Sequence, residues 1–321
     1  MRAAIIGYGV IGKVHAKVIP SYAELVAICD IDEAKLEEAP DVVHYTDWKK
    51  MLDEVRPEAV HICTPHYLHA EMVIEALGRG INVLCEKPLC IRDEDIGRIL
   101  DAAKNSTAQL GVCLQNRYNA SNLAVKEYLE GKKVEAGVGQ VSWHRDAAYY
   151  ASGDWRGKWA TEGGGVLINQ SLHTLDLMQW FCGMPESLSA TVSNMTLKDA
   201  IEVEDTATLL CTGKDGGSFN FYASIGAAYD CPVEITLLAD RKWIKIMPNY
   251  TVIGDEIVTY KDRFPAHGKG CYGSGHEALI ADWYDCLECG RHFAIDGEEG
   301  AKVVKLILAA YRSGGKKVKI W

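Results

Sequence analysis

The sequence has little positive charge and no long apolar run. Its 34 lysines and arginines are outnumbered by 44 acidic residues, which gives a formal net charge of -10 at pH 7. Such a chain offers no general basic face to nucleic acid or to an anionic membrane, since phosphate groups repel it. No apolar stretch approaches the roughly 18 residues that a membrane-spanning helix needs. We therefore expect no nucleic-acid and no membrane partner, and leave a small local basic pocket open.

The sequence also lacks the features of a secreted, disulfide-bonded or metal-binding protein. Met1 and Arg2 lead directly into an apolar segment, 3–6, which leaves no room for a signal peptide. The eleven cysteines are an odd number dispersed through apolar contexts, a pattern that fits a reducing compartment. One pair, Cys286 and Cys289, has metal-like spacing, but it stands alone in an expected helix. We predict a cytoplasmic chain without a metal site.

The length and the order of the apolar segments predict two domains. A chain of 321 residues exceeds the size at which one hydrophobic core usually stops growing. In the first part, short strands alternate with helical patterns, which predicts βαβ units and a parallel sheet. The expected strands are 3–6, 25–29, 58–63, 82–85 and 109–114, and the expected helices are 11–19, 33–38, 68–77 and 91–105.

After about residue 120 the pattern changes to strands separated by local turns such as Asp215-Gly216-Gly217. The expected strands are 140–145, 188–192, 206–211, 218–222, 233–239 and 243–246. Consecutive strands with short turns favour a largely antiparallel sheet. A helix expected at 121–131 precedes these strands, and helices expected at 171–181, 278–289 and 298–311 would cover one face of the sheet. The other face or an edge is then available for subunit contact or for a ligand.

A glycine motif follows the first strand and opens the first helix. Gly7, Gly9 and Gly12 form G-x-G-x-x-G, with Val10 and Ile11 inside it. The first glycine permits a tight turn, the second lets the backbone approach a pyrophosphate, and the third lets the helix pack on the strand. The pattern predicts a Rossmann dinucleotide-binding domain over 1–120, followed by an α+β domain over 121–321.

An acidic residue closes the second expected strand. Asp30 is followed by Ile31 and Asp32. A carboxylate there accepts hydrogen bonds from the adenine ribose and repels a 2'-phosphate, so NAD is favoured over NADP. The alternative role is a helix N-cap before Glu33, which Asp32 could fill while Asp30 faces the ribose.

Two segments follow further strands, where ligands of open parallel sheets bind: Thr64-Pro65-His66 and Glu86-Lys87-Pro88. Lys87 should emerge at the carboxyl edge of the sheet, near the nicotinamide. Beside that positive ring it should give up its proton readily and exchange one with a substrate hydroxyl. The alternative is an ordinary solvated surface lysine.

The second domain supplies a matching segment. A helix that begins near Asn169 would place Asn169, His173 and Asp176 on one face, and three glycines, Gly163 to Gly165, would let its start approach a ligand. His173 is then a candidate partner of Lys87 in proton transfer. Asp176 would orient that histidine or make a structural hydrogen bond.

These motifs resemble the glucose-fructose oxidoreductase, inositol dehydrogenase and rhizopine-catabolism (Gfo/Idh/MocA) family of NAD(P)-dependent oxidoreductases. The resemblance spans the chain and rests on five segments: Gly7 to His15, Thr64-Pro65 with His69, Glu86-Lys87-Pro88, Gly163 to His173, and Gly275-His276. It implies that Lys87 is the acid/base lysine and that the Lys87-Pro88 bond is cis. It also implies that Thr64, Pro65, His69 and Glu86 lie with Lys87 on the cofactor side, and that a large open sheet forms dimers or tetramers. Asn169 departs from the aspartate of inositol-dehydrogenase-like members, and an amide cannot titrate.

The remaining candidates are substrate contacts. They are polar or aromatic side chains suited to a polyhydroxylated ring: Arg117, Tyr118, Trp155, Arg156, Asn169, Gln170 and His276. Arg156 could also hold a carboxylate. The alternatives are that the arginines tie the two domains together and that His276 serves as a helix start.

The predicted activity is reversible hydride transfer between NAD and a ring hydroxyl or keto group of a sugar, cyclitol or sugar acid. A runner-up is transient oxidation, in which NAD is reduced and reoxidised while a glycoside is eliminated or cleaved. A third class is a dinucleotide-binding regulator without turnover, for which neither Lys87 nor His173 would be needed. Reduction of an aromatic diol or tetrapyrrole would require a more apolar pocket.

Overall fold

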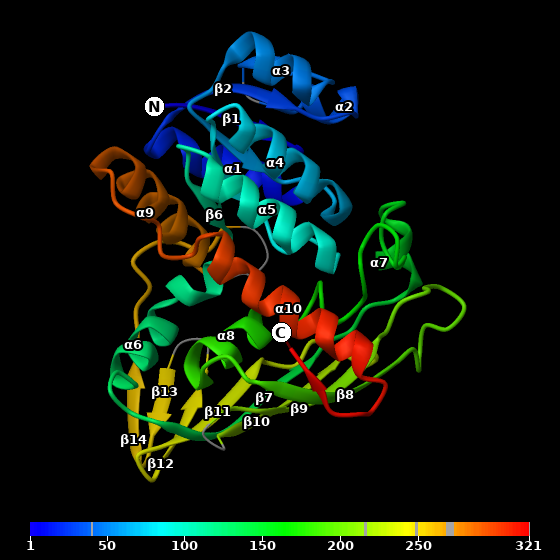
Figure 1. Ribbon diagram of the computed structural model, residues 1–321, viewed down its shortest axis with the longest axis vertical. Coiled ribbons are helices and arrows are strands. Elements are labelled where there is room, and N and C mark those ends of the chain that lie inside the picture. The colour runs from blue at the N-terminus through cyan, green and yellow to red at the C-terminus, as the bar shows by residue number, and fades with distance from the viewer. Residues whose placement is uncertain (40, 215–216, 248–249, 268–272, 321) are drawn as a thin grey trace. The chain divides into compact units, whose positions relative to one another are not determined.

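The computed structural model describes residues 1–39, 41–214, 217–247, 250–267 and 273–320. The chain divides into two compact units (Figure 1). Unit 1 comprises Met1–Gln115 and Phe264–Ala301, and unit 2 comprises Asn116–Arg263 and Lys302–Trp321. The expected domain boundary at residue 120 differs from this division, because the chain returns to unit 1 after residue 263. Val112 N donates to Ile295 O at 2.9 Å, so the returning segment pairs beside the last strand of the first sheet.

Unit 1 contains a six-stranded sheet in the order β3-β2-β1-β4-β5-β6, with every pair parallel. Its strands are β1 Arg2–Ile6, β2 Glu24–Cys29, β3 Val43–Tyr45, β4 Ala59–Ile62, β5 Asn82–Cys85 and β6 Leu110–Val112. The helices are α1 Val10–Val18, α2 Glu33–Leu36, α3 Trp48–Val55, α4 His69–Gly78, α5 Asp93–Asn105 and α9 Gly275–Cys289. All four residues of β4 are buried, so both faces of the sheet are covered. The strand order reverses between β1 and β4, the position at which such sheets bind dinucleotides. The Rossmann prediction is confirmed.

Unit 2 contains a nine-stranded sheet in the order β14-β13-β12-β11-β7-β10-β9-β8-β15, in which only the β7–β10 pair is parallel among the described residues. Its strands are β7 Val134–Ser142, β8 Ser187–Ser193, β9 Thr206–Thr212, β10 Ser218–Ser224, β11 Glu234–Ala239, β12 Lys242–Ile246, β13 Tyr250–Ile253, β14 Glu256–Thr259 and β15 Val318–Lys319. The prediction of a mostly antiparallel sheet is confirmed.

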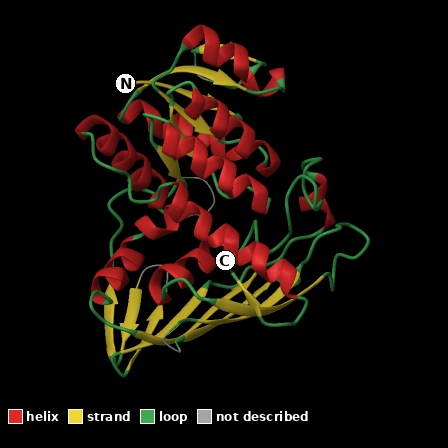
Figure 2. Cartoon of the chain, in the orientation of Figure 1, coloured by secondary structure: helices red, strands yellow, loops and turns green. Residues whose placement is uncertain are grey.

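One face of this sheet carries helices (Figure 1): α6 Ala120–Tyr128, α8 Leu172–Cys182 and the later part of α10 Gly297–Ser313. In β9 and β10 buried residues alternate with exposed or partly exposed ones, as expected for a sheet with one solvated face. Figure 2 shows no helix on that second face within the described chain. Gly137 and Gly139 of β7 let α8 approach closely, because a Cβ at either would lie within 2.9 Å of Met178.

Several expected boundaries are wrong. The helix expected from Asn169 begins only at Leu172, after a series of turns. The strand expected over 140–145 is β7, which runs from Val134 to Ser142; its two glycines hide it, because glycine is depleted in strands. The shorter elements α3, α7 (Ala147–Ala151), β3, β13, β14 and β15 were not predicted. The turn at Asp215-Gly216 lies outside the described residues. No helix in the described ranges is long and apolar enough to cross a membrane.

Candidate cofactor and active site

The glycine motif has the geometry that a dinucleotide requires. Gly7 ends β1 with φ +93°, and a Cβ there would lie 2.6 Å from the Cys63 carbonyl oxygen. A Cβ on Gly12 would lie 2.1 Å from the Gly7 carbonyl oxygen, so the helix packs against the turn. A Cβ on Gly9 would meet nothing within 4 Å. Gly9 precedes α1, so amides at the helix start face a space that a pyrophosphate can approach.

Asp30 lies beside this turn, and Asp32 has the helix-cap role foreseen for it. Asp30 Oδ2 accepts from Tyr8 N at 2.7 Å, and Oδ1 accepts from Asp32 N at 3.0 Å. Asp32 caps α2 by accepting from Ala34 N at 3.1 Å. Lys35 Nζ lies 3.3 Å from Asp30 Oδ1, a contact that the sequence did not suggest. The neighbouring Ile31 is 88% exposed.

Lys87 directly follows β5, at the carboxyl edge of the sheet, and is half-buried. The Lys87-Pro88 bond is cis, as the resemblance implied. The buried His69 ring lies between two backbone carbonyls, with Nδ1 at 2.7 Å from Pro88 O and Nε2 at 2.9 Å from Thr64 O. It thereby joins the two segments that follow β4 and β5. Burial lowers the pKa of His69, which favours the neutral ring.

A buried carboxylate, that of Glu86, accepts a hydrogen bond from the Lys87 backbone. Glu86 Oε2 accepts from Lys87 N at 3.1 Å, and Oε1 lies 3.1 Å from His15 Nε2 and 3.7 Å from His276 Nε2. Burial alone would raise the pKa of Glu86, but the two histidines outweigh it and hold this pKa well below its usual value. Glu86 is therefore an anion at neutral pH and acts only as an acceptor.

The hydrogen-bonded network around Glu86 extends from His15 to His61 and Tyr284. His15 Nδ1 lies 2.7 Å from His61 Nδ1, and His61 Nε2 lies 2.8 Å from the Tyr284 hydroxyl. Burial lowers the pKa of His61 well below its usual value, so this ring is neutral. Because an ionised carboxylate can only accept, His15 Nε2 donates to Glu86, and the neutral His61 ring donates through one nitrogen and accepts through the other.

Three buried residues of this region, His15, Glu86 and Cys113, have ligand atoms within 4.8 Å of one another. The sequence predicts no metal site. In the structure His15 and Glu86 are hydrogen-bonded to each other, and burial raises the pKa of the Cys113 thiol well above its usual value. The hydrogen bonds that His15 and Glu86 make to their neighbours account for the positions of these two side chains.

In unit 2, the glycine run serves packing inside the protein. A Cβ on Gly164, whose φ is +148°, would lie 1.9 Å from the Tyr311 hydroxyl, and one on Gly165 would lie 1.9 Å from Glu204 O. The expectation that these glycines allow close approach of a ligand is thus wrong for Gly164 and Gly165. They instead let the segment before α8 pack against Tyr311 and Glu204.

Asn169 lies in the turns before α8, and His173 lies in its first turn. Asn169 Nδ2 donates to Glu162, a fully buried carboxylate that also accepts from Gly157 N. The same amide lies 3.4 Å from the Tyr149 hydroxyl, as does Gln170 Nε2. The amides next to His173 are therefore held by a carboxylate and a phenol. His173 itself is half-buried.

Arg117 and Asp176 form a buried ion pair within unit 2. The Asp176 oxygens accept from Arg117 Nε at 2.7 Å and Nη2 at 2.6 Å, and both residues are at most 3% exposed. Asp176 also accepts from Gln179 at 3.0 Å. The structural role foreseen for Asp176 is confirmed. Tyr118 is partly exposed and ends the short 3-10 turn Gln115–Tyr118.

Arg156 lies between two aromatic rings. Its guanidinium carbon is 4.6 Å from the Tyr149 ring centroid and 4.5 Å from that of Trp155. Arg156 Nη1 donates to the Tyr149 hydroxyl at 2.7 Å. The phenol thus joins the predicted substrate residues Trp155 and Arg156 to Asn169 and Gln170.

Two protein-family models match this chain. A model described as the oxidoreductase family with an NAD-binding Rossmann fold matches residues 1–114, and the GFO/IDH/MocA C-terminal domain matches residues 131–245. The chain belongs to the Gfo/Idh/MocA oxidoreductase family. It is therefore an enzyme, an NAD-binding oxidoreductase of the group that includes sugar and cyclitol dehydrogenases.

Individual family members match at low identity over long stretches. An inositol 2-dehydrogenase of Rubrobacter xylanophilus is 26% identical over 98% of this chain and 92% of that protein. A D-glucoside 3-dehydrogenase of Escherichia coli is 31% identical over 58% of this chain and 55% of that protein. The solved structure of the WlbA dehydrogenase from Bordetella pertussis, in complex with NADH and UDP-GlcNAcA, is 28% identical. It has a TM-score of 0.87 and covers 99% of this chain and 98% of that one.

In this member of the Gfo/Idh/MocA family, the predicted cofactor residues and most of the predicted substrate residues lie in different units. The cofactor candidates lie in unit 1, and all substrate candidates except Lys87 and His276 lie in unit 2. His276 is 2% exposed in the first turn of α9, beside Glu86, which is the helix-start position of the alternative. The arginine pairs described above are made within unit 2.

Sequence reasoning missed Tyr149 and Glu162, which contact substrate candidates of unit 2, and His61 and Tyr284, which extend the network of Glu86 in unit 1. The sequence feature that could have indicated Glu162 is its position directly before the glycine run. Tyr284 is 223 residues from His61 along the chain, so no local pattern could pair them.

Proposed function

We propose that this enzyme transfers hydride between NAD and a ring hydroxyl or keto group of a sugar, cyclitol or sugar acid. The observation that carries the proposal is the position of Lys87, half-buried directly after β5 in the sheet whose β1 turn has the dinucleotide geometry. The names of the relatives agree, since inositol and glucosides both carry ring hydroxyls.

NAD, when bound, supplies the hydride acceptor. Lys87 accepts the proton of the substrate hydroxyl as the carbon that bears it loses hydride. Glu86 holds the Lys87 backbone in place, and His173 of unit 2 is the proposed second proton-transfer group. Asn169 cannot titrate, so its amide, oriented by Glu162, binds a hydroxyl.

We also propose that NAD is preferred over NADP. Asp30 lies 8% exposed at the end of β2, where its negative charge disfavours a ribose phosphate. Lys35, 3.3 Å from Asp30, offsets part of that charge, which makes the preference smaller than an isolated aspartate would give. Comparing the Kd values of NADH and NADPH tests this preference.

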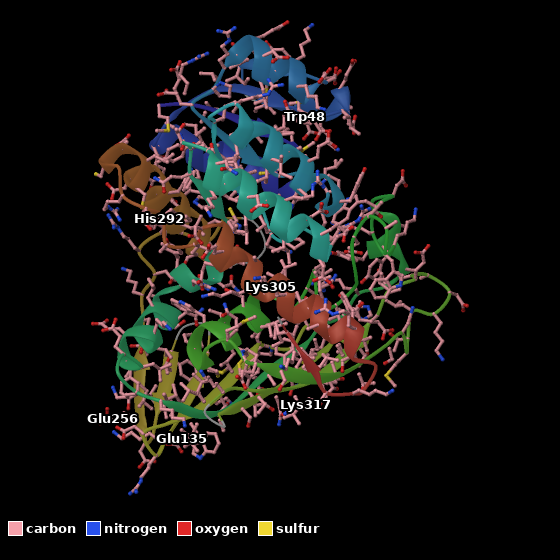
Figure 3. The ribbon with its side chains drawn as sticks, viewed as in Figure 1. Trp48, Glu135, Glu256, His292, Lys305 and Lys317 are labelled. Carbon is pink, nitrogen blue, oxygen red and sulfur yellow. The ribbon has the colours of Figure 1, made fainter. Side chains whose placement is uncertain are left out.

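The uncovered face of the nine-stranded sheet supports self-association as a dimer or tetramer. The strand pairing places Val138, Leu210, Tyr222, Trp243 and Ile257 on one face, and each is at least 39% exposed. Exposed apolar side chains that share a sheet face are typical of subunit interfaces. The exposed Glu135 and Glu256, labelled in Figure 3, lie on strands β7 and β14 of the same sheet. Sedimentation of the wild type and of Trp243→Glu measures the oligomer.

The ten described cysteines are free thiols, which supports the cytoplasm as the working compartment.

The test of the activity is Lys87→Ala. We expect kcat for the best substrate in a panel of sugars, cyclitols and sugar acids to fall roughly 10²- to 10⁴-fold. NADH affinity should stay within about twofold, since the amine acts on the substrate. Normal turnover by this variant would contradict the mechanism. Product formed without net NADH would instead identify the transient-redox reaction.

A further inference from the structure

Two arginines stack on the same tyrosine ring, and only one of them has an acidic partner. Arg145 lies 5.4 Å from the Tyr149 centroid and pairs with Asp230 at 2.9 and 3.2 Å. Arg156 lies 4.6 Å from that centroid. Among the described residues, no carboxylate oxygen lies within 4.0 Å of the Arg156 guanidinium. The positive charge of Arg145 is neutralised within the protein, whereas that of Arg156 is not.

The surroundings of Arg156 are rich in hydrogen-bond donors. Arg156 Nη1, Asn169 Nδ2 and Gln170 Nε2 all face the Tyr149 hydroxyl oxygen, at 2.7, 3.4 and 3.4 Å. A phenolic oxygen accepts two hydrogen bonds at most, so these donors exceed what Tyr149 can satisfy. Asn169 Nδ2 also donates to Glu162, so Arg156 and Gln170 are the donors that an anion could recruit. The two longer contacts are weak, and an anionic oxygen placed beside the phenol would take such donors with a gain in energy.

This donor-rich group belongs to the segment that carries the proposed proton-transfer residue. Asn169 and Gln170 come directly before α8, and His173 lies in the first turn of that helix. The stacking of Arg156 between Tyr149 and Trp155 fixes the plane of its guanidinium, which prepares it for bidentate contact with a planar anion. A carboxylate matches that fork better than a hydroxyl does.

We propose that Arg156 binds a carboxylate of the substrate, so that this enzyme acts on a sugar acid in preference to a neutral sugar or cyclitol. The proposal rests on the proposed function, because it names the substrate class of the same site. Tyr149 holds Arg156 in position, and the amide of Gln170 completes the anion's surroundings. The electron balance is unchanged: the ring carbon still gives hydride to NAD, and the carboxylate takes no part in the reaction.

The test compares matched pairs of compounds that differ only in the anion. D-glucose and D-galactose are paired with D-glucuronate and D-galacturonate, and a third arm contains the corresponding sugar 6-phosphates. We expect kcat/KM to be at least tenfold higher for the uronates than for both other arms. Equal values for acid and neutral members, or a preference for the phosphates, would overturn the proposal.

Two matched arginine variants show which residue is responsible. Arg156→Gln should raise KM for the uronate roughly 10- to 100-fold with a smaller change in kcat, and Arg156→Lys should restore part of the loss. Arg145→Gln, which removes the arginine already paired with Asp230, should leave the acid preference within about twofold. Circular dichroism checks that each variant is folded. An Arg156→Gln enzyme that keeps the full acid preference would contradict the assignment.

Calorimetric titration separates this proposal from the proposed activity. Uronate binding to the NADH-loaded protein requires no turnover, so it is measured even if no compound is oxidised. The carboxylate site is supported if uronates bind more tightly than neutral sugars and Arg156→Gln abolishes the difference. An absence of turnover would then count only against the proposed dehydrogenase activity. Equal binding of acid and neutral members would overturn the carboxylate site, whatever the turnover.

Discussion

Glu86 in unit 1 and Glu204 in unit 2 are both almost fully buried, yet their pKa values are displaced in opposite directions. The pKa of Glu86 is held well below its usual value, whereas burial raises that of Glu204 to about 7. Glu204 accepts from Gly165 N at 2.9 Å, Leu167 N at 3.0 Å and the Tyr311 hydroxyl at 3.0 Å. These neutral donors do not offset the loss of water, but the histidines around Glu86 do. Burial alone therefore does not decide the charge of a carboxyl group.

The largest expected effect is on stability at pH 7. Glu86→Gln removes an anion from a buried network and should lower the free energy of unfolding by about 3 kcal/mol. Glu204→Gln replaces a group whose ionised form is disfavoured by burial, so it should not lower the free energy of unfolding at that pH. Chemical denaturation of both variants measures the difference. Equal losses would mean that the two carboxyl groups have the same charge.

The second prediction concerns the pH dependence of stability. The pKa of Glu204 is higher in the folded chain, about 7, than its usual 4.5, so the folded state binds more protons between these values. Stability from this group is fully present below about pH 4.5 and is lost as pH rises to 7, by roughly 3 kcal/mol in total. Glu204→Gln should remove that fall. An unchanged slope in the variant would show that Glu204 titrates normally.

Glu86 should give the opposite trend. Because its folded pKa is lowered, its stabilisation is present above the usual carboxyl pKa and is lost as pH falls through the lower folded value. The difference in unfolding free energy between wild type and Glu86→Gln should therefore shrink on acidification. A difference that grows toward acid pH would contradict an ionised Glu86.

The smallest expected effect comes from the far end of the histidine chain. Tyr284→Phe removes the hydroxyl partner of His61 Nε2 and should cost about 1 kcal/mol of stability, with NADH affinity unchanged. Nitrogen-15 NMR of the wild type should show His61 as a neutral ring at pH 7, because burial lowers its pKa. An imidazolium at His61 would contradict this assignment.

The sequence predicts those features of the two regions that depend on residues close together along the chain. The glycine turn and Lys87 could be predicted because a motif and a strand end lie within a few residues of each other. The environment of Glu86 could not, because His276 approaches it from a segment nearly 200 residues later that joins unit 1. The start of α8 was misplaced because Gly164 and Gly165 serve packing against Tyr311 and Glu204, which sequence spacing does not reveal. Asn169 consequently lies before the helix and is held by Glu162.

The central proposal is that Lys87 and His173 both take part in the proton transfer that accompanies hydride loss. A double-mutant cycle with Lys87→Ala and His173→Ala, measured as kcat/KM for the best uronate or sugar, tests it most directly. We predict that the double variant loses little more activity than the worse of the two single variants, because the groups work as one unit. Losses that simply multiply would show that the two residues act independently and would contradict the account.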